Sequence, residues 1–217
     1  MESPNPTSPP LAPAAERDEH VRTRLLNAAV RVFDRKGYAA ASVREVAEMA
    51  GVTKPAVYYH FGSKEGLLLA ILEQAKQDVE AALERAVGRA GTARSRVLAL
   101  CEDTYGLFGQ NVPIARVAHA VFLGPPDGAP AFDVTVFEKR FRGALELIAS
   151  DGLASGELRD VAPRDVALAV MGILEGCNER QMHPAFEPVG ADGLRRLINL
   201  LFDGVSGAPR AEGEGRP

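Results

Sequence analysis

Residues 41–68, with the sequence ASVREVAEMAGVTKPAVYYHFGSKEGLL, decide the fold because they contain the start and end signals of consecutive short helices. Ser42 and Glu45 have the spacing of a capping box, in which a serine hydroxyl and a glutamate carboxylate satisfy amide groups at a helix N-terminus. Gly51 is placed to end that helix in a left-handed conformation, and Thr53 stands where the next helix begins. Two short helices joined by such a turn predict a helix-turn-helix.

Longer helices are expected on both sides of this unit. Before it, a helix over roughly Asp18–Lys36 has one apolar stripe at helical spacing, made of Val21, Leu25, Ala28, Ala29, Val32 and Phe33. After it, Ser63 caps a long fourth helix whose apolar stripe continues well beyond the helix-turn-helix. We therefore predict that a small and a larger domain meet within the fourth helix, near residues 70–75.

The rest of the chain also has helical periodicity, without any alternation long enough for a strand. Further helices are predicted near residues 93–110, 113–123, 130–151, 163–181 and 191–203. The proline-rich residues 1–15 and the residues 205–217, rich in glycine and charge, predict disordered tails. The fold class is therefore all-α, with a three-helix domain over residues 16–72 and a second helical domain over residues 73–204.

The charge of the chain is unevenly distributed. The 217 residues are 46% hydrophobic and have a formal net charge of −4, which by itself argues against a nucleic-acid binder. From His20 to Lys64, however, there are eight basic and three acidic residues, so this segment has a net charge of +5 and the rest has −9. A segregated cationic segment suits a polyanionic partner such as nucleic acid.

Cysteine use and targeting signals favour a reducing compartment. Cys101 and Cys177 are far apart and neither belongs to a CxxC or Cys/His cluster, which excludes a disulfide scaffold and a zinc knuckle. The sequence has neither a secretory signal nor an apolar run long enough to span a bilayer. We expect a cytoplasmic protein without membrane association.

The helix that follows Thr53 has an aromatic outer face. On a helical projection Val57 and Phe61 point inward, and the residues on or beside the opposite face are Pro55, Ala56, Tyr58, Tyr59 and His60. Exposed tyrosines at this density indicate a surface that docks onto a partner. The residues alone leave two partners open, the major groove of DNA or another protein, and the surrounding basic residues favour DNA.

The pattern V-x-x-V-A-x-x-A-G-V-T-x-x-x-V-Y-x-H-F-x-S-K-E-x-L, which begins at Val43, closely resembles the DNA-binding domain of TetR-family transcriptional regulators. The resemblance covers residues 20–72 directly. It implies a sequence-specific DNA-binding regulator, a homodimer on a palindromic operator of double-stranded DNA. It further implies a repressor that is released when a small-molecule effector binds in the C-terminal ligand-binding and dimerisation domain. No cofactor or metal is expected.

Ten residues are candidate contacts to DNA. They are Ser42, Arg44, Thr53, Lys54, Pro55, Ala56, Tyr58, Tyr59, His60 and Lys64. The resemblance implies phosphate contacts for Thr53, Tyr58 and Lys64, base reading by Lys54, Pro55, Ala56 and Tyr59, and either kind of contact for Arg44. His60 matches a family position that also steadies the helix, and Ser42 stands where the family often has threonine. Lys64 opposes the dipole of its own helix unless a phosphate binds there.

The C-terminal domain suggests a ligand cavity and a dimer interface. The resemblance implies an effector pocket between the middle helices, suited to an apolar or aromatic molecule, with candidate residues Tyr105, Phe108, His119, Phe122, Phe137, Phe141, Met171 and Asn178. Two apolar stripes near the chain end are candidates for the dimer interface: Val166, Val170, Ile173, Cys177, Leu194, Leu197, Ile198 and Leu201. From pattern alone, burial of these side chains within one chain is an equally good interpretation.

An enzyme is the third class of function considered. The sequence has no HExxH, GxSxG or glycine-rich phosphate loop. Only Glu102, Asp103 and His119 could be brought together by folding into an acid/base or metal site. Because such widely spaced residues are usually solvated or structural, we expect that the chain is not an enzyme.

Overall fold

The computed structural model describes residues 14–123 and 134–205. Within these ranges the chain forms nine α-helices and no strand, which confirms the predicted all-α fold. The helices are α1 (Ala14–Lys36), α2 (Val43–Ala50), α3 (Lys54–Phe61), α4 (Lys64–Gly88), α5 (Ala93–Gln110), α6 (Val112–Leu123), α7 (Val134–Ala154), α8 (Pro163–Met182) and α9 (Gly190–Val205). None of the nine combines the length and the apolar character that a membrane span requires.

The described helices differ from the predicted ones mainly at their ends. α1 begins at Ala14, four residues before the predicted start, so the last two residues of the predicted tail belong to a helix. Alanine favours helix strongly enough to extend it there. The rest of the predicted tails, residues 1–13 and 206–217, lies outside the described residues. So do residues 130–133 of the helix predicted at 130–151.

Local capping explains where the short helices begin and end. The Glu45 amide donates to the Ser42 hydroxyl at 3.3 Å, and the Ser42 amide donates to the Glu45 carboxylate at 3.1 Å, which confirms the capping box. Gly51 ends α2 with a φ of 63°, a left-handed conformation that glycine adopts without strain. Ser63 caps α4 by accepting from the Gly66 amide at 3.0 Å. Thr53 is the N-cap residue of α3, but its hydroxyl makes no cap hydrogen bond.

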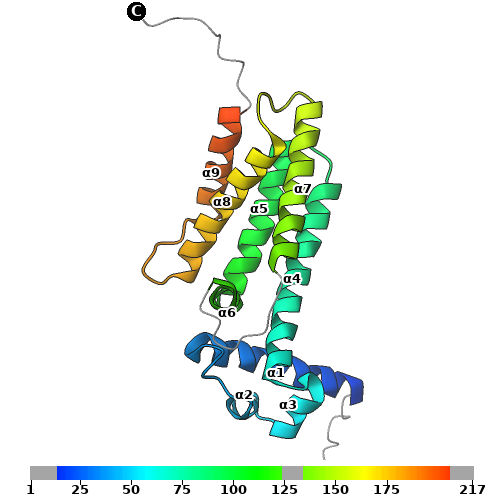
Figure 1. Ribbon diagram of the computed structural model, residues 1–217, viewed down its shortest axis with the longest axis vertical. Helices are drawn as coiled ribbons and strands as arrows, with labels where there is room; N and C mark the ends of the chain where they lie inside the picture. The colour runs from blue at the N-terminus through cyan, green and yellow to red at the C-terminus, as the bar shows by residue number, and fades with distance from the viewer. Residues whose placement is uncertain (1–13, 124–133, 206–217) are drawn as a thin grey trace, which may run out of the picture.

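Two hydrophobic clusters share the long helix α4. Leu68 and Ile71 of α4 pack with α1, α2 and α3, whereas Ala82 and Leu83, further along, pack with the C-terminal helices. Figure 1 shows α4 rising from the small N-terminal unit into a bundle of α5, α7, α8 and α9, with α6 seen end-on between the two parts. The predicted boundary between residues 72 and 73 falls between the two sets of α4 residues.

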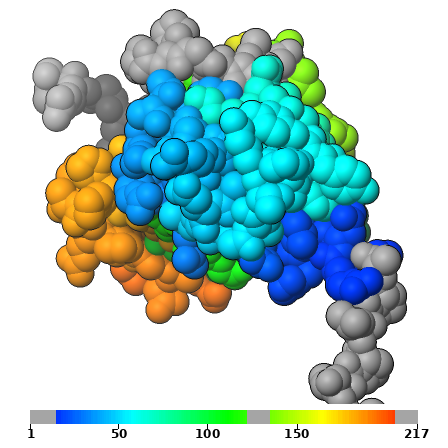
Figure 2. All heavy atoms as spheres, turned by 90° about the horizontal axis from the view of Figure 1, so that it is seen from below, coloured from blue at the N-terminus to red at the C-terminus, as the bar shows by residue number. Residues whose placement is uncertain are grey.

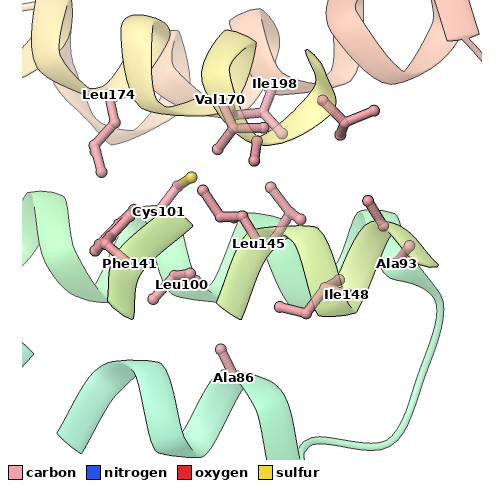
Figure 3. Packing of buried hydrophobic residues seen from close by; sticks show 14 of the residues in the cluster. Ala86, Ala93, Leu100, Cys101, Phe141, Leu145, Ile148, Val170, Leu174 and Ile198 are labelled. Atoms are coloured by element: carbon pink, nitrogen blue, oxygen red, sulfur yellow. The ribbon is translucent and has the colours of Figure 1, made fainter. Parts of the chain in front are cut away.

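The larger cluster fills the interior of the C-terminal bundle. Leu100 and Cys101 of α5 face Leu145 of α7, while Val170 of α8 and Ile198 of α9 close the cluster from the other side (Figure 3). Burial raises the pKa of the Cys101 thiol to about 12, so this cysteine is a neutral core residue. Together with Ala82, Leu83 and Ala86 of α4, side chains from five helices fill the bundle.

This packing corrects the predicted dimer interface. Five of the eight candidate residues are buried within one chain and have no surface to offer a partner: Val166, Val170, Cys177, Leu194 and Ile198. Ile173 and Leu201 are partly buried against the same cluster, and only Leu197 is exposed, at 38%. The apolar stripes of α8 and α9 thus mainly hold these helices to α5 and α7, as the alternative interpretation of the pattern allowed.

Candidate nucleic-acid interface

The outer face of α3 is the most exposed aromatic surface among the described residues. Tyr59 is 78% exposed and Tyr58 is 45% exposed, next to the exposed Lys54 and Pro55. Ala56 is half-buried at the edge of this face. Figure 2 views the molecule from this end, where α1, α2, α3 and the start of α4, coloured blue to cyan, occupy most of the coloured surface.

The inner face of α3 fixes its orientation. Val57 is fully buried against the N-terminal cluster. The His60 side chain is only 7% exposed and lies with its Nε2 3.6 Å from the Asp18 carboxylate on α1. The structure therefore turns His60 away from the face on which the sequence placed it, and its contact is with α1.

The close approach of α3 and α4 requires glycine at position 66. A Cβ atom on Gly66 would lie 1.9 Å from the Phe61 carbonyl oxygen, which no rotamer change could relieve. This contact sets the angle at which α3 leaves the start of α4.

At the N-terminus of α2, charged side chains bind one another. Glu45 interacts with Lys36 as well as with Ser42, and these hydrogen bonds lower the pKa of the Glu45 carboxyl to about 2, the bond from Lys36 having the largest effect. Arg44 is exposed and its Nε donates to Glu48 at 2.9 Å. Because both partners in that pair are largely solvated, the pair is weak.

Lys64 has a role that sequence reasoning missed. Its ammonium group donates to the carbonyl oxygens of Tyr38, Ala39 and Ala41 at 2.9, 3.2 and 3.1 Å, and it lies 4.4 Å from the Tyr38 ring centroid. These three bonds use all three N–H groups of the lysine. The phosphate contact of Lys64 stays a prediction. The lysine ties the start of α4 to the segment between α1 and α2.

Arg24 is a second tie that the sequence did not reveal. It donates to the carbonyl oxygens of Ala50 and Gly51 at the C-terminal end of α2. A guanidinium there also complements the negative end of the helix dipole. In the sequence Arg24 counts only as one basic residue among eight. Its contact could not be predicted, because the acceptors are backbone carbonyl oxygens 26 and 27 positions away.

The predicted effector pocket is not open in this structure. Tyr105 and Phe141 are buried in the core, Phe137 and Met171 pack against it, Asn178 is buried and Phe108 is half-buried. The Tyr105 hydroxyl accepts from the Gly190 amide at 3.0 Å. The side chain of Phe122 lies outside the described part. Aromatic residues were taken as cavity lining, whereas they fill the space between the helices.

An open groove of about 550 Å³ lies instead at the junction of the two parts of the molecule. It is lined by the end of α1 and the following turn, by α6, and by the end of α8, and His119 is the one predicted pocket residue in it. Beside the groove, Arg116 of α6 binds Asp34 of α1 through two hydrogen bonds of 2.7 Å. Val117 of α6 is buried in the N-terminal cluster. Helix α6 thus belongs to both parts.

The residues that could have formed an enzyme site are occupied elsewhere. Glu102 pairs with Arg195 at 2.7 Å and Asp103 with Arg85 at 3.1 Å, whereas His119 lies at the junction groove. The described residues contain no group of three or more histidine, cysteine, aspartate or glutamate side chains that could hold a metal ion.

Comparison with known proteins agrees with the geometry. The model of the family "Bacterial regulatory proteins, tetR family" matches residues 25–71. The HTH-type transcriptional activator FasR of Mycolicibacterium smegmatis is 41% identical over 156 residues, which cover 71% of this chain and 70% of FasR.

Solved structures extend the likeness to nearly the whole chain. The TetR-family regulator PfmR from Thermus thermophilus superposes with a TM-score of 0.66 at 26% identity, covering 90% of this chain and 98% of PfmR. AibR, solved in complex with isovaleryl coenzyme A and operator DNA, has a TM-score of 0.63 at 20% identity, covering 86% of this chain and 98% of AibR. The chain belongs to the TetR family of bacterial regulators, and it is a DNA-binding transcriptional regulator rather than an enzyme.

Proposed function

We propose that the chain acts as a homodimer that binds a palindromic DNA operator through α3 and leaves it when an effector binds. The observation that carries the proposal is the outer face of α3, where Tyr59 is 78% exposed on a helix whose opposite side is anchored by the fully buried Val57. A helix held in this way can enter a major groove as a rigid body.

DNA binding can be tested by selecting duplexes from a random library and measuring affinity at fixed salt. Tyr59→Ala should weaken binding to a selected duplex at least about tenfold, because burying a large apolar side chain contributes roughly 1.5–3 kcal/mol. The melting temperature of the Tyr59→Ala protein should equal that of the parent chain, since the Tyr59 side chain is exposed. Leu147→Ala, on α7 and 48% exposed, is the matched control and should bind like the parent chain. A library that yields no enriched duplex would contradict the proposed function.

Dimerisation places two copies of α3 on successive turns of DNA, which is why palindromic operators suit this arrangement. Leu168 of α8 and Leu197 and Leu200 of α9 are exposed, with Leu200 at 70%. Leu200 is the most exposed aliphatic side chain among the large hydrophobic residues described, and Leu197 lies three residues before it on the same helix, so this part of α9 favours burial against another surface. We assign the dimer contact to these side chains in place of the buried residues of the predicted stripes.

We propose that effector binding changes DNA affinity through the contact between α1 and α6. An effector acts by binding one conformer of the protein more tightly than another. A conformer in which α6 separates from α1 would break the Arg116–Asp34 pair and release Val117 from the N-terminal cluster. A thermal-shift screen of small apolar and aromatic molecules, followed by DNA binding with each hit, tests this. Hits that bind without changing DNA affinity would count against it.

The sign of regulation has two candidates. The TetR-family resemblance favours a repressor, whereas the 41% identity to FasR, which is named an activator, favours activation. Transcription in vitro from the promoter that carries the selected operator separates them, because a repressor lowers the amount of transcript and an activator raises it.

A further inference from the structure

The outer face of α3 has one side chain that can read a purine base by paired hydrogen bonds, Lys54, which suits guanine. The sequence of α3 is KPAVYYHF, which contains no arginine, asparagine or glutamine. Arginine reads guanine and asparagine or glutamine reads adenine through two hydrogen bonds each. Any preference of α3 for bases other than guanine must therefore come from other contacts.

Among the neighbouring helices, α2 offers the exposed Arg44 as a second candidate to read guanine, whereas carboxamides that could read adenine are scarce. Asn27 is the one carboxamide in residues 14–72, and it lies on α1 in a shallow hollow shared with Arg24, Arg31 and the end of α2. The Lys54 ammonium lies 5.7 Å from the centroid of the Tyr58 ring. With three N–H groups on a flexible stem, it suits a phosphate or the O6 and N7 acceptors of one guanine.

What α3 does offer is a rigid apolar surface. Pro55 has a fixed backbone and lies exposed in the first turn, beside the methyl group of the half-buried Ala56. The Tyr59 ring packs edge-to-face on the His60 ring, with centroids 5.0 Å apart and planes at 82°. The His60 side chain is only 7% exposed and is therefore fixed in place. The Tyr59 ring packs on it, so Tyr59 is exposed but has a restricted orientation.

We propose that this surface recognises DNA by the 5-methyl groups of thymine. Thymine is the base that presents a methyl group in the major groove, where it makes apolar contacts with small aliphatic and aromatic side chains. Each operator half-site would then present thymines to Pro55, Ala56 and the ring of Tyr59. This inference rests on the proposed function, since it specifies which feature of the operator α3 reads.

The experiment replaces dT by dU in a duplex selected from the random library by the full-length chain. Uracil pairs with adenine as thymine does and lacks only the methyl group. We expect affinity to fall about fourfold for each contacted methyl group within the half-sites, as expected for one buried methyl group. Replacement at thymines outside the half-sites should have no effect.

Two variants assign the effect to α3. Tyr59→Phe should keep the dT preference, whereas Tyr59→Ala should lower affinity for the dT duplex and reduce the penalty for dU at the position beneath the ring. Lys54→Ala serves as the control and should weaken binding to the dT and dU duplexes equally. A dU penalty that is unchanged in Tyr59→Ala contradicts the role given to this ring.

The two possible failures can be told apart. If no duplex is enriched, both the proposed function and this inference are overturned. If a duplex is enriched and binds equally well with dU at every half-site position, the function stands and recognition through thymine methyl groups is overturned.

Discussion

At the scale of single residues, the cationic segment of the sequence acts largely within the protein. Lys64 binds three carbonyl oxygens, Arg24 binds two, and Lys36 pairs with Glu45. The net charge of +5 remains and attracts DNA at long range. The number of cations available for direct phosphate contacts is smaller than the sequence count suggests, so the salt dependence of binding should be correspondingly shallower.

Lys64→Met tests the structural role of this lysine. The substitution keeps an unbranched apolar stem and removes the ammonium that donates to the carbonyl oxygens of Tyr38, Ala39 and Ala41. We expect urea unfolding to show a loss of about 2 kcal/mol, the scale of hydrogen bonds to a charged group. Lys54→Met should leave stability unchanged and weaken DNA binding. Equal stability of Lys64→Met and the parent chain would contradict the role we assign.

Glu45 makes the stability of the α1–α2 contact dependent on pH. Its pKa is lowered from 4.5 to about 2 in the folded chain, chiefly by hydrogen bonding to Lys36, so the unfolded state binds the proton more readily. The stabilisation is therefore complete above pH 4.5 and is lost as the pH falls towards 2. Glu45→Gln should lower the free energy of unfolding at pH 7, and the difference should shrink below pH 4.5. A difference that is constant with pH would argue against this account.

At the scale of elements, α6 connects the two parts of the molecule through a polar and an apolar contact. Arg116 binds Asp34 with both carboxylate oxygens engaged, and Val117 enters the N-terminal cluster beside it. Hydrogen bonding to Asp34 raises the pKa of the Arg116 guanidinium further, so the pair stays charged. A change in the position of α6 must therefore disturb α1.

A double-mutant cycle of Arg116→Ala and Asp34→Ala measures this link. Because Arg116 is 41% exposed, we expect a coupling energy of only about 1 kcal/mol in the free energy of unfolding. Each single variant should also reduce the change in DNA affinity that an effector hit produces. The pair of Arg142 with Glu138 on α7 provides the control cycle, which should leave the effector response intact.

Sequence reasoning succeeded where a signal is local and failed where it needs tertiary context. The capping box at Ser42 and the left-handed Gly51 follow from residues three to nine positions apart, and the structure confirms both. The target of Lys64 lies 23 to 26 positions away on backbone oxygens, which no pattern reveals. Likewise, an apolar stripe such as that of α8 fits burial within a chain as well as between chains, and only packing identifies Val170 as interior.

At the scale of the whole molecule, the two most exposed large hydrophobic side chains among the described residues lie in different parts of the molecule. Tyr59 is on α3 and Leu200 is on α9, which Figure 1 shows in different parts of the molecule. The proposed dimer contact and the proposed DNA contact therefore do not compete for surface. A substitution at the proposed dimer contact should therefore leave the proposed DNA contact unchanged.

Leu200→Glu should convert the dimer to monomers. A charge at the proposed contact is costly to desolvate, whereas in the monomer the side chain is 70% exposed and the substitution leaves the fold intact. Sedimentation velocity should show the halved mass, and affinity for the palindrome should fall steeply while affinity for a single half-site is retained. Leu147→Glu, on α7, should remain dimeric. A dimeric Leu200→Glu variant would place the interface elsewhere.

The continuity of α4 has a mechanical consequence. Its 25 residues form one rod of about 37 Å that has one end in each hydrophobic cluster. Such a rod is a lever arm. By simple trigonometry, a tilt of about 5° at the bundle end displaces the other end by roughly 3 Å, close to the rise of one base pair along a DNA strand. A small tilt in the bundle would thus move the N-terminal unit by about one base-pair step.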